Sequence, residues 1–209
     1  MPTNVLIPVY SMYGHTLTLA HAVAEGAAGV GDVEVRLRRI AEFAELRDQL
    51  ADDAAYQKAQ ADLDQLGTAG LDDLRWADGM VWGSPTRYGN MTAQMKQLID
   101  STSSLWLDGA LENKVVGMFT STASIHGGQE TTILTSLPCF IHLGMIVVGV
   151  RYGQNPQLLT TEGQGGSPYG ASTVTGSDGS RQPSEPELAT ARSLGARVAT
   201  IAARCKGLE

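Results

Sequence analysis

The chain has 209 residues, of which 43% are hydrophobic and 18% charged, and its formal net charge is −7. This length suits one medium-sized α/β domain with a single buried core, so a wholly disordered chain is excluded. The acidic balance leaves no broad basic surface for nucleic acid, and no such partner is expected. The only cysteines, Cys139 and Cys205, are far apart, which is typical of a reducing compartment and not of a disulfide framework.

No segment has the pattern of a signal peptide or a membrane helix. The first ten residues contain no lysine or arginine, which a signal peptide needs at its start. The longest apolar run, residues 140–150, is far shorter than the ~20 residues of a membrane-spanning helix. We therefore expect a cytoplasmic protein without membrane insertion.

Taken in chain order, the hydrophobic pattern predicts strands that alternate with helices. Residues 5–10 form a nearly continuous apolar, β-branched run, which indicates a buried strand. An amphipathic helix follows around residues 19–27, and residues 32–39 alternate like an outer strand. Later strands are expected at 79–84, 114–120 and 145–150, and later helices at 91–99, 131–143 and 185–204. Such βαβ units predict a doubly wound, five-stranded parallel sheet with helices on both faces.

Two segments fit this alternation poorly. Residues 41–74 are rich in Ala, Asp and Gln, and we interpret them as an insertion or long crossover that contains helical turns. Residues 152–186 are rich in Gly, Ser, Thr and Pro with little periodicity, which predicts a long loop. Neither segment indicates a second core, so residues 1–209 are expected to form one domain.

The first loop after a predicted central strand is Ser-Met-Tyr-Gly-His-Thr at residues 11–16. Its backbone N–H groups and the dipole of the following helix suit an anion such as a phosphate, without any lysine. It contains neither the Gly-Lys-Ser/Thr of a Walker loop nor the GxGxxG of dinucleotide folds. The alternative is an ordinary helix start with Ser11 or Thr16 as its cap.

Two further loops follow predicted central strands, and parallel sheets bind ligands at the carboxyl ends of their strands. In the loop 85–90, Arg87 and Tyr88 offer a flat surface and hydrogen bonds to a planar ring; the alternative is a plain turn in which Asn90 caps the next helix. The loop 121–128 is rich in small residues, so its backbone can approach a ligand closely. One binding site would explain all three loops.

These motifs resemble a known family. Residues 11–16, Pro-Thr-Arg-Tyr-Gly-Asn-Met at 85–91 and His-Gly-Gly-Gln-Glu at 126–130 resemble the WrbA family of flavodoxin-like NAD(P)H:quinone oxidoreductases. Gly-Gly-Ser-Pro-Tyr-Gly-Ala at 165–171 and Gly-Ser-Arg-Gln-Pro-Ser-Glu at 179–185 are similar as well. The resemblance covers nearly the whole chain in the right order, and residues 41–74 are its least typical part. It implies a flavodoxin-like fold and places residues 152–186 near the active site.

The resemblance also implies an FMN site and the residues that form it. The implied cofactor-binding residues are Ser11, Met12, Tyr13, Gly14, His15, Thr16, Thr86, Arg87, Tyr88, Ser121, Thr122, Ala123, Ser124, Ile125, His126 and His142. Tyr13 is further implied near the nicotinamide, and Trp106 beside the quinone substrate. From the residues alone, Trp106 and His142 are more typical of core positions. The family's assemblies imply a homotetramer whose active sites are completed by neighbouring protomers.

The activity implied by the resemblance is a two-electron reduction of quinones to hydroquinones. In a ping-pong sequence, NADH or NADPH gives a hydride to flavin N5, and a quinone then takes the place of the nicotinamide. No side chain is assigned a catalytic role, and the four histidines lack metal-ligand spacing, so no metal is expected. The alternative is a flavodoxin-like one-electron carrier, or an FMN-dependent interaction protein without NAD(P)H oxidation. No arginine cluster indicates a preference for NADPH over NADH.

Overall fold

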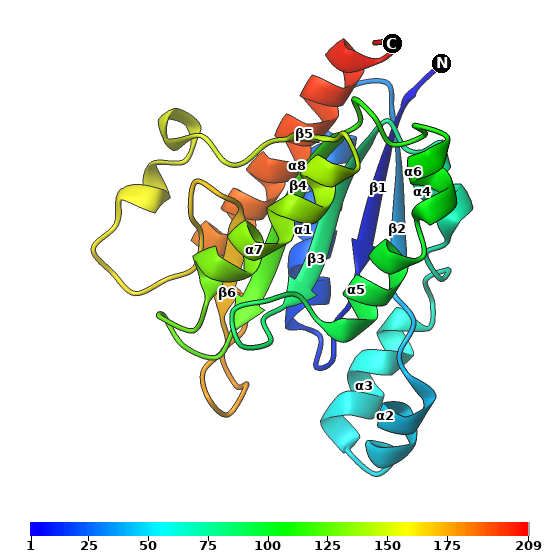
Figure 1. Cartoon of the computed structure of the whole chain (residues 1–209). Coiled ribbons are helices and arrows are strands. Elements are labelled where there is room, and N and C mark those ends of the chain that lie inside the picture. The colour runs from blue at the N-terminus through cyan, green and yellow to red at the C-terminus, as the bar shows by residue number, and fades with distance from the viewer. Residues whose placement is uncertain (209) are drawn as a thin grey trace.

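The computed structural model describes residues 1–208 and contains one parallel β-sheet between two layers of helices (Figure 1). The sheet order is β2-β1-β3-β4-β5, and a further short strand, β6, pairs with β4. The strands are β1 (Thr3–Val9), β2 (Val33–Arg39), β3 (Gly79–Pro85), β4 (Val115–Thr122), β5 (Ile146–Val147) and β6 (Ala171–Val174). Since every pairing is parallel, all carboxyl ends meet at one edge, and the expected doubly wound fold is confirmed.

The strand predicted at residues 145–150 is wrong in its extent. Only Ile146–Val147 pair with the start of β4, whereas Phe119–Thr122 of β4 pair with Ala171–Val174. The chain turns away because the N–H of Val150 donates to the carbonyl oxygen of Pro168 at 2.8 Å. The last position of the sheet is therefore shared by two short strands, and one of them lies in the segment expected to be loop.

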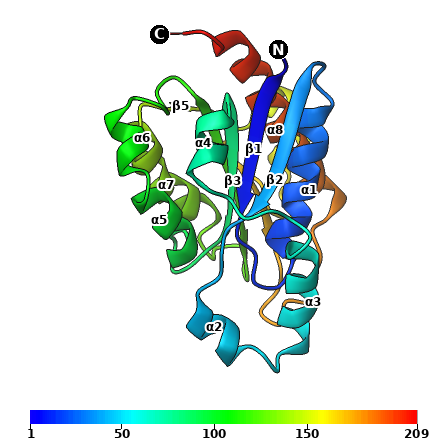
Figure 2. The ribbon, with the colours of Figure 1, turned by 90° about the vertical axis from the view of Figure 1, so that its right-hand side faces the viewer.

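Helices cover both faces of the sheet, as the two views show (Figures 1 and 2). One face is covered by α1 (His15–Ala28) and α8 (Glu185–Cys205), and the other by α4 (Leu71–Trp76), α5 (Ala93–Asp100), α6 (Ser103–Leu107) and α7 (Gln129–His142). Alternate residues of β1 serve the two cores, with Val5 and Ile7 toward α1 and α8 and Leu6 toward the other layer. No helix among residues 1–208 is long and apolar enough to cross a membrane.

The layer of α1 and α8 is held by a backbone contact at two glycines. A Cβ on Gly26 would lie 1.9 Å from the carbonyl oxygen of Arg192, and a Cβ on Gly195 would lie 2.0 Å from that of Val23. These distances are far below any real contact, so only glycine lets the two helices approach this closely. The contact joins the first helix of the chain to the last.

Residues 41–74 contain α2 (Ala44–Gln49), α3 (Ala54–Leu63) and the start of α4. Figure 2 shows α2 and α3 below the carboxyl ends of the strands, outside the sheet. The side-chain amide of Gln60 in α3 donates to the carbonyl oxygens of Ser11 and Met12 at 3.2 and 3.3 Å. The segment therefore forms a helical cover that is fastened to the loop after β1. The remaining regular elements are two 3₁₀ turns, Tyr152–Gln154 and Pro156–Leu159.

Candidate functional site

A cavity of about 1080 Å³ lies at the carboxyl ends of β1, β3 and β4. This volume is slightly above the ~300–1,000 Å³ range that is usual for ligand pockets. Its walls come from the three predicted loops, from α3 and from the segment after β6. The residues that line it are 11–18, His21, Asp53, Ala55, Lys58, Ala59, Asp62, 85–87, 121–123, 175–179 and Gln182.

The loop after β1 ends in an uncapped helix start. Gly14 is the N-cap of α1, has φ of +94°, and provides no side-chain cap. The hydroxyl of Ser11 accepts the N–H of Gly14 at 3.1 Å, and the hydroxyl of Thr16 lies 2.9 Å from that of Ser121. The structure therefore excludes the alternative of a helix capped by Ser11 or Thr16. The first N–H groups of α1 remain available at the cavity, where the helix dipole favours an anion.

The loop after β3 turns sharply outward. Arg87 and Asn90 close the turn with two backbone hydrogen bonds of 2.8 and 3.0 Å, and Tyr88 has a positive φ of 52°. The ring of Tyr88 is fully exposed and does not line the cavity, whereas Thr86 and Arg87 do. The guanidinium of Arg87 lies 3.5 Å from the sulfur of Met12, which joins the first two loops. The helix after this loop is capped by the hydroxyl of Thr92, so the alternative of an Asn90 cap is excluded.

The loop after β4 contributes only its first part to the cavity. Ser121, Thr122 and Ala123 line it, whereas Ser124, Ile125 and His126 are exposed and lie outside the lining. The amide of Gln129 at the start of α7 donates to the carbonyl oxygen of Ile125 at 2.8 Å and fixes the end of the loop. A cofactor role for residues 124–126 remains a prediction.

Trp106 and His142 do not join this cavity within one chain. They line a second cavity of about 430 Å³, together with Lys96 and Cys139. The N–H of Asn113, just before β4, donates to the carbonyl oxygen of Gly144 at 2.9 Å, so the end of α7 lies beside the amino end of the sheet. Trp106 is 59% exposed and His142 is also exposed, so neither is the core residue that its local sequence suggested. Their roles at the flavin remain predictions that require a second copy of the chain.

Sequence reasoning missed the wall that α3 provides. The carboxylate of Asp53 caps α3 through the N–H groups of Ala55 and Tyr56, and it accepts a hydrogen bond from the hydroxyl of Tyr13 at 3.2 Å. The N–H of Tyr56 lowers the pKa of Asp53, and burial together with Asp53 raises the pKa of Tyr13. Tyr13 is therefore neutral and its ring is held at the rim. The Asp53-Ala54 boundary is a typical helix start, but nothing local indicates that it faces this cavity.

The segment after β6 supplies the other missed wall, residues 175–179 and Gln182. The N–H of Thr175 donates to the carbonyl oxygen of Thr122 at 2.8 Å, which places this segment beside the third loop. The resemblance placed residues 152–186 near the active site and included the motif 179–185, but it named no cofactor-binding residue in this segment.

The hydroxyl of Tyr10, which directly precedes the first loop, is bound within the protein. The hydroxyl of Tyr10 donates to the carboxylate of Glu42 at 2.6 Å and accepts from the amide of Gln94 at 3.2 Å. Burial, followed by this hydrogen bond, raises the pKa of Tyr10 far above its ordinary value. The phenol is therefore neutral at any physiological pH. No cluster of three metal-ligating side chains occurs within residues 1–208.

Comparison with known proteins agrees with this geometry. The profile of the family described as NADPH-dependent FMN reductase matches residues 10–154. A protein from Trichlorobacter lovleyi named NAD(P)H dehydrogenase (quinone) is 46% identical over 202 residues, covering 97% of this chain and 98% of that protein. A protein of the same name from Geobacter metallireducens is 46% identical and covers 98% of this chain and 100% of its own length.

Solved structures show the same architecture. A WrbA-like flavodoxin from Agrobacterium tumefaciens superposes with a TM-score of 0.63 at 27% identity, over 98% of this chain and 99% of that one. A flavodoxin from the domain Archaea has a TM-score of 0.61 at 17% identity, over 96% and 99% of the two chains, and shows the fold alone. Fold and cavity thus define a flavodoxin-like protein. The chain belongs to the FMN reductase family and, within it, to the WrbA family.

Proposed function

We propose that this chain is an FMN-dependent NAD(P)H dehydrogenase (quinone) that reduces quinones by two electrons to hydroquinones. The observation that carries the proposal is the uncapped start of α1 at Gly14, which faces a cavity large enough for a cofactor and a second ligand. The free N–H groups there, with the buried hydroxyls of Thr16 and Ser121, fit a phosphate group. The names of the full-length relatives support the same activity.

Each of the three loops contributes residues to the binding of FMN. Residues 11–16 would hold the phosphate, and Thr86, Arg87 and Ser121–Ala123, which also line the cavity, would hold the flavin ring. When bound, FMN would supply N5, which can accept a hydride from NADH or NADPH, and the reduced flavin would then give two electrons to the quinone. Backbone N–H groups of residues 121–123 stabilise negative charge on the ring. Tyr88 and residues 124–126 form the outer rim.

Tyr13 binds the nicotinamide. Its ring is 44% exposed at the rim, and its hydroxyl is fixed by Asp53 in α3. An aromatic face in this position lets a planar ring stack over the cavity while the charged Asp53 stays at the edge. Because stacking limits the motion of the donor, it brings the two reacting atoms into a productive orientation.

Trp106 and His142 complete the site from a neighbouring copy in a homotetramer. Both side chains lie on the surface of the second cavity, and the neighbouring side chains Leu107 and Ile141 are exposed as well. Exposed apolar side chains gathered in this way mark a surface that another molecule covers. A cytoplasmic location also remains part of the proposal.

An anaerobic titration tests the function. The full chain is loaded with FMN, NADH or NADPH is added, and the flavin absorbance is followed before and after addition of benzoquinone. Bleaching followed by full recovery is the expected result, and protein without FMN should oxidise neither nicotinamide. Bound FMN that no nicotinamide reduces would refute the reductase and favour a one-electron carrier.

A further inference from the structure

The loop 175–182 forms one wall of the cavity. It contains none of the cofactor-binding residues named above. Five consecutive residues, 175–179, face the cavity, and Gln182 follows. Nε2 of His15, in the first turn of α1, lies 2.9 Å from the carbonyl oxygen of Gly179 and donates to it. The loop therefore faces the phosphate-binding start of α1.

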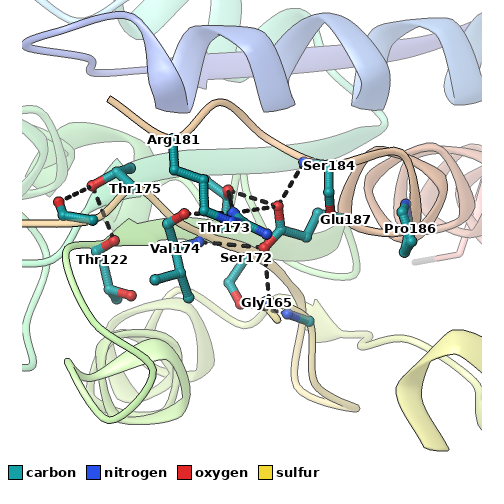
Figure 3. A network of polar contacts seen from close by, with 12 residues as sticks. Thr122, Gly165, Ser172, Thr173, Val174, Thr175, Arg181, Ser184, Pro186 and Glu187 are labelled. Atoms are coloured by element: carbon teal, nitrogen blue, oxygen red, sulfur yellow. Dashed lines mark hydrogen bonds and ion pairs between the residues drawn. The ribbon is translucent and has the colours of Figure 1, made fainter. Parts of the chain in front are cut away.

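The base of this loop is fastened by one buried carboxylate, that of Glu187 in the first turn of α8 (Figure 3). Its oxygens accept hydrogen bonds from partners that lie before, after and beside the loop. These donors are the N–H of Ser184 at 2.7 Å, the N–H of Gly165 at 2.8 Å, the hydroxyl of Thr173 at 2.9 Å and the guanidinium of Arg181 at 3.0 Å. The carboxylate thus holds both ends of the loop at once.

Glu187 is charged although it is fully buried. Burial alone would raise its pKa, but the guanidinium of Arg181 and the N–H groups of Ser184 and Gly165 outweigh it and hold the pKa below its ordinary value. A buried carboxylate is costly unless it is paired and hydrogen-bonded. For the capping box at the start of α8, the carboxylate of Glu187 has to accept only one hydrogen bond, that from the N–H of Ser184. The remaining donors show that this carboxylate organises more than its own helix.

Arg181 is the link between the carboxylate and the cavity. Its guanidinium also donates to the carbonyl oxygen of Val174, at the end of β6, so it spans the two ends of the loop. Its backbone N–H donates to the carbonyl oxygen of Thr175 at 2.9 Å. Thr175 in turn donates to Thr122 of the third loop. A continuous set of bonds therefore leads from Glu187 to the cavity wall.

We propose that the loop 175–182 contacts the phosphate and ribityl end of FMN, and that Glu187 is a positioning residue that acts through Arg181 and this loop. The proposal rests on the FMN site of the proposed function. It accounts for the motif 179–185, in which Gly179 and Gln182 line the cavity whereas Arg181 does not. The loop would contribute polar groups to the cavity, such as Ser177 and Gln182, while the carboxylate of Asp178 accepts the N–H and hydroxyl of Ser180.

Two variants test the proposal. Glu187→Gln keeps the size of the side chain but removes the charge and presents an N–H₂ group to some of the donors. Arg181→Gln is milder, because the Arg181 side chain is 36% exposed and the other donors to Glu187 remain. Lys114→Met is the matched control: its Nζ binds the carbonyl oxygens of Leu74 and Arg75 at the amino end of the sheet, far from the cavity.

FMN is titrated into each full-length variant by fluorescence quenching, and amide hydrogen exchange is measured for residues 175–184. We expect both loop variants to weaken FMN binding by about tenfold or more, equivalent to one hydrogen bond to a charged group. Exchange should accelerate in 175–184 but not in β1 or α1. Lys114→Met should leave FMN affinity and loop exchange unchanged.

The outcomes separate this proposal from the proposed function. If wild-type protein binds FMN and both loop variants bind it equally well, Glu187 is a helix cap only and the proposal is refuted. The same conclusion holds if the two loop variants change only the melting temperature and, like Lys114→Met, leave FMN affinity and loop exchange unchanged. Failure of the wild-type chain to bind FMN would refute the proposed function, and the ligand named here with it.

Discussion

Replacement of Gly14 by alanine isolates backbone strain in the phosphate-binding loop. An added Cβ would meet its nearest neighbour, the Cβ of Ala59, at 3.8 Å, which is an ordinary contact. The cost is therefore conformational, since φ of +94° lies where side-chain-bearing residues are rare. Such a residue costs about 1–3 kcal/mol. If the loop keeps its shape, this cost falls on the free energy of unfolding; if the loop relaxes in the free protein, the cost reappears on FMN binding.

The loss in free energy of unfolding and the loss in free energy of FMN binding should therefore sum to about 1–3 kcal/mol, however the cost is divided between them. Urea denaturation of the FMN-free protein measures the first, and a fluorescence titration with FMN measures the second. A cost that falls wholly on binding weakens FMN by about 5- to 150-fold. Gly31→Ala is the control, since no atom lies within 4 Å of its added Cβ and its φ is not positive. A sum near zero in Gly14→Ala would show that binding does not require this backbone conformation.

Three further results are expected. Burial lowers the pKa of Lys114 from 10.5 to about 8. Between these two pH values the unfolded chain binds more protons than the folded one, so the free energy of unfolding should rise from pH 8 to 10.5. Urea titrations of Lys114→Met should lack this part of the rise. Gly195→Ala should reduce the free energy of unfolding by about 1–3 kcal/mol in chemical denaturation, because its Cβ would overlap the Val23 carbonyl; unchanged stability would mean that α1 and α8 separate freely. Trp106→Ala should raise the KM for the quinone and leave FMN affinity unchanged, and unaltered quinone kinetics would remove Trp106 from the site.

The parts of the fold that depend on local pattern could be predicted. The apolar run at residues 5–10 is typical of a strand buried on both sides, and β1 lies in the middle of the sheet. The apolar face of residues 185–204 corresponds to α8. The division of the last sheet position between β5 and β6 could not be predicted, because it depends on the carbonyl of Pro168, which only tertiary structure brings to Val150.

The same distinction applies to the cavity. Loops that directly follow central strands were found, since chain direction alone takes them to the carboxyl edge of the sheet. Lys58 and residues 175–179 reach the cavity by packing of distant segments, so no local spacing marks them. Trp106 and His142 were assigned to the quinone and the cofactor only through family resemblance. The roles proposed for them at a flavin depend on contacts between copies, which no pattern within one chain contains.

The cavity is built from segments near both ends of the chain, so it cannot form completely while the chain is still being synthesised. Its wall at 11–18 is made early, but the loop that meets His15 and the strand that pairs with the carboxyl half of β4 are made late. A growing chain that lacks them has an open edge on β4 and an uncovered face where α8 belongs on α1. Such an edge invites pairing with other chains. Only the complete chain can therefore form the whole cavity, so a bound cofactor would distinguish complete chains from prematurely terminated ones.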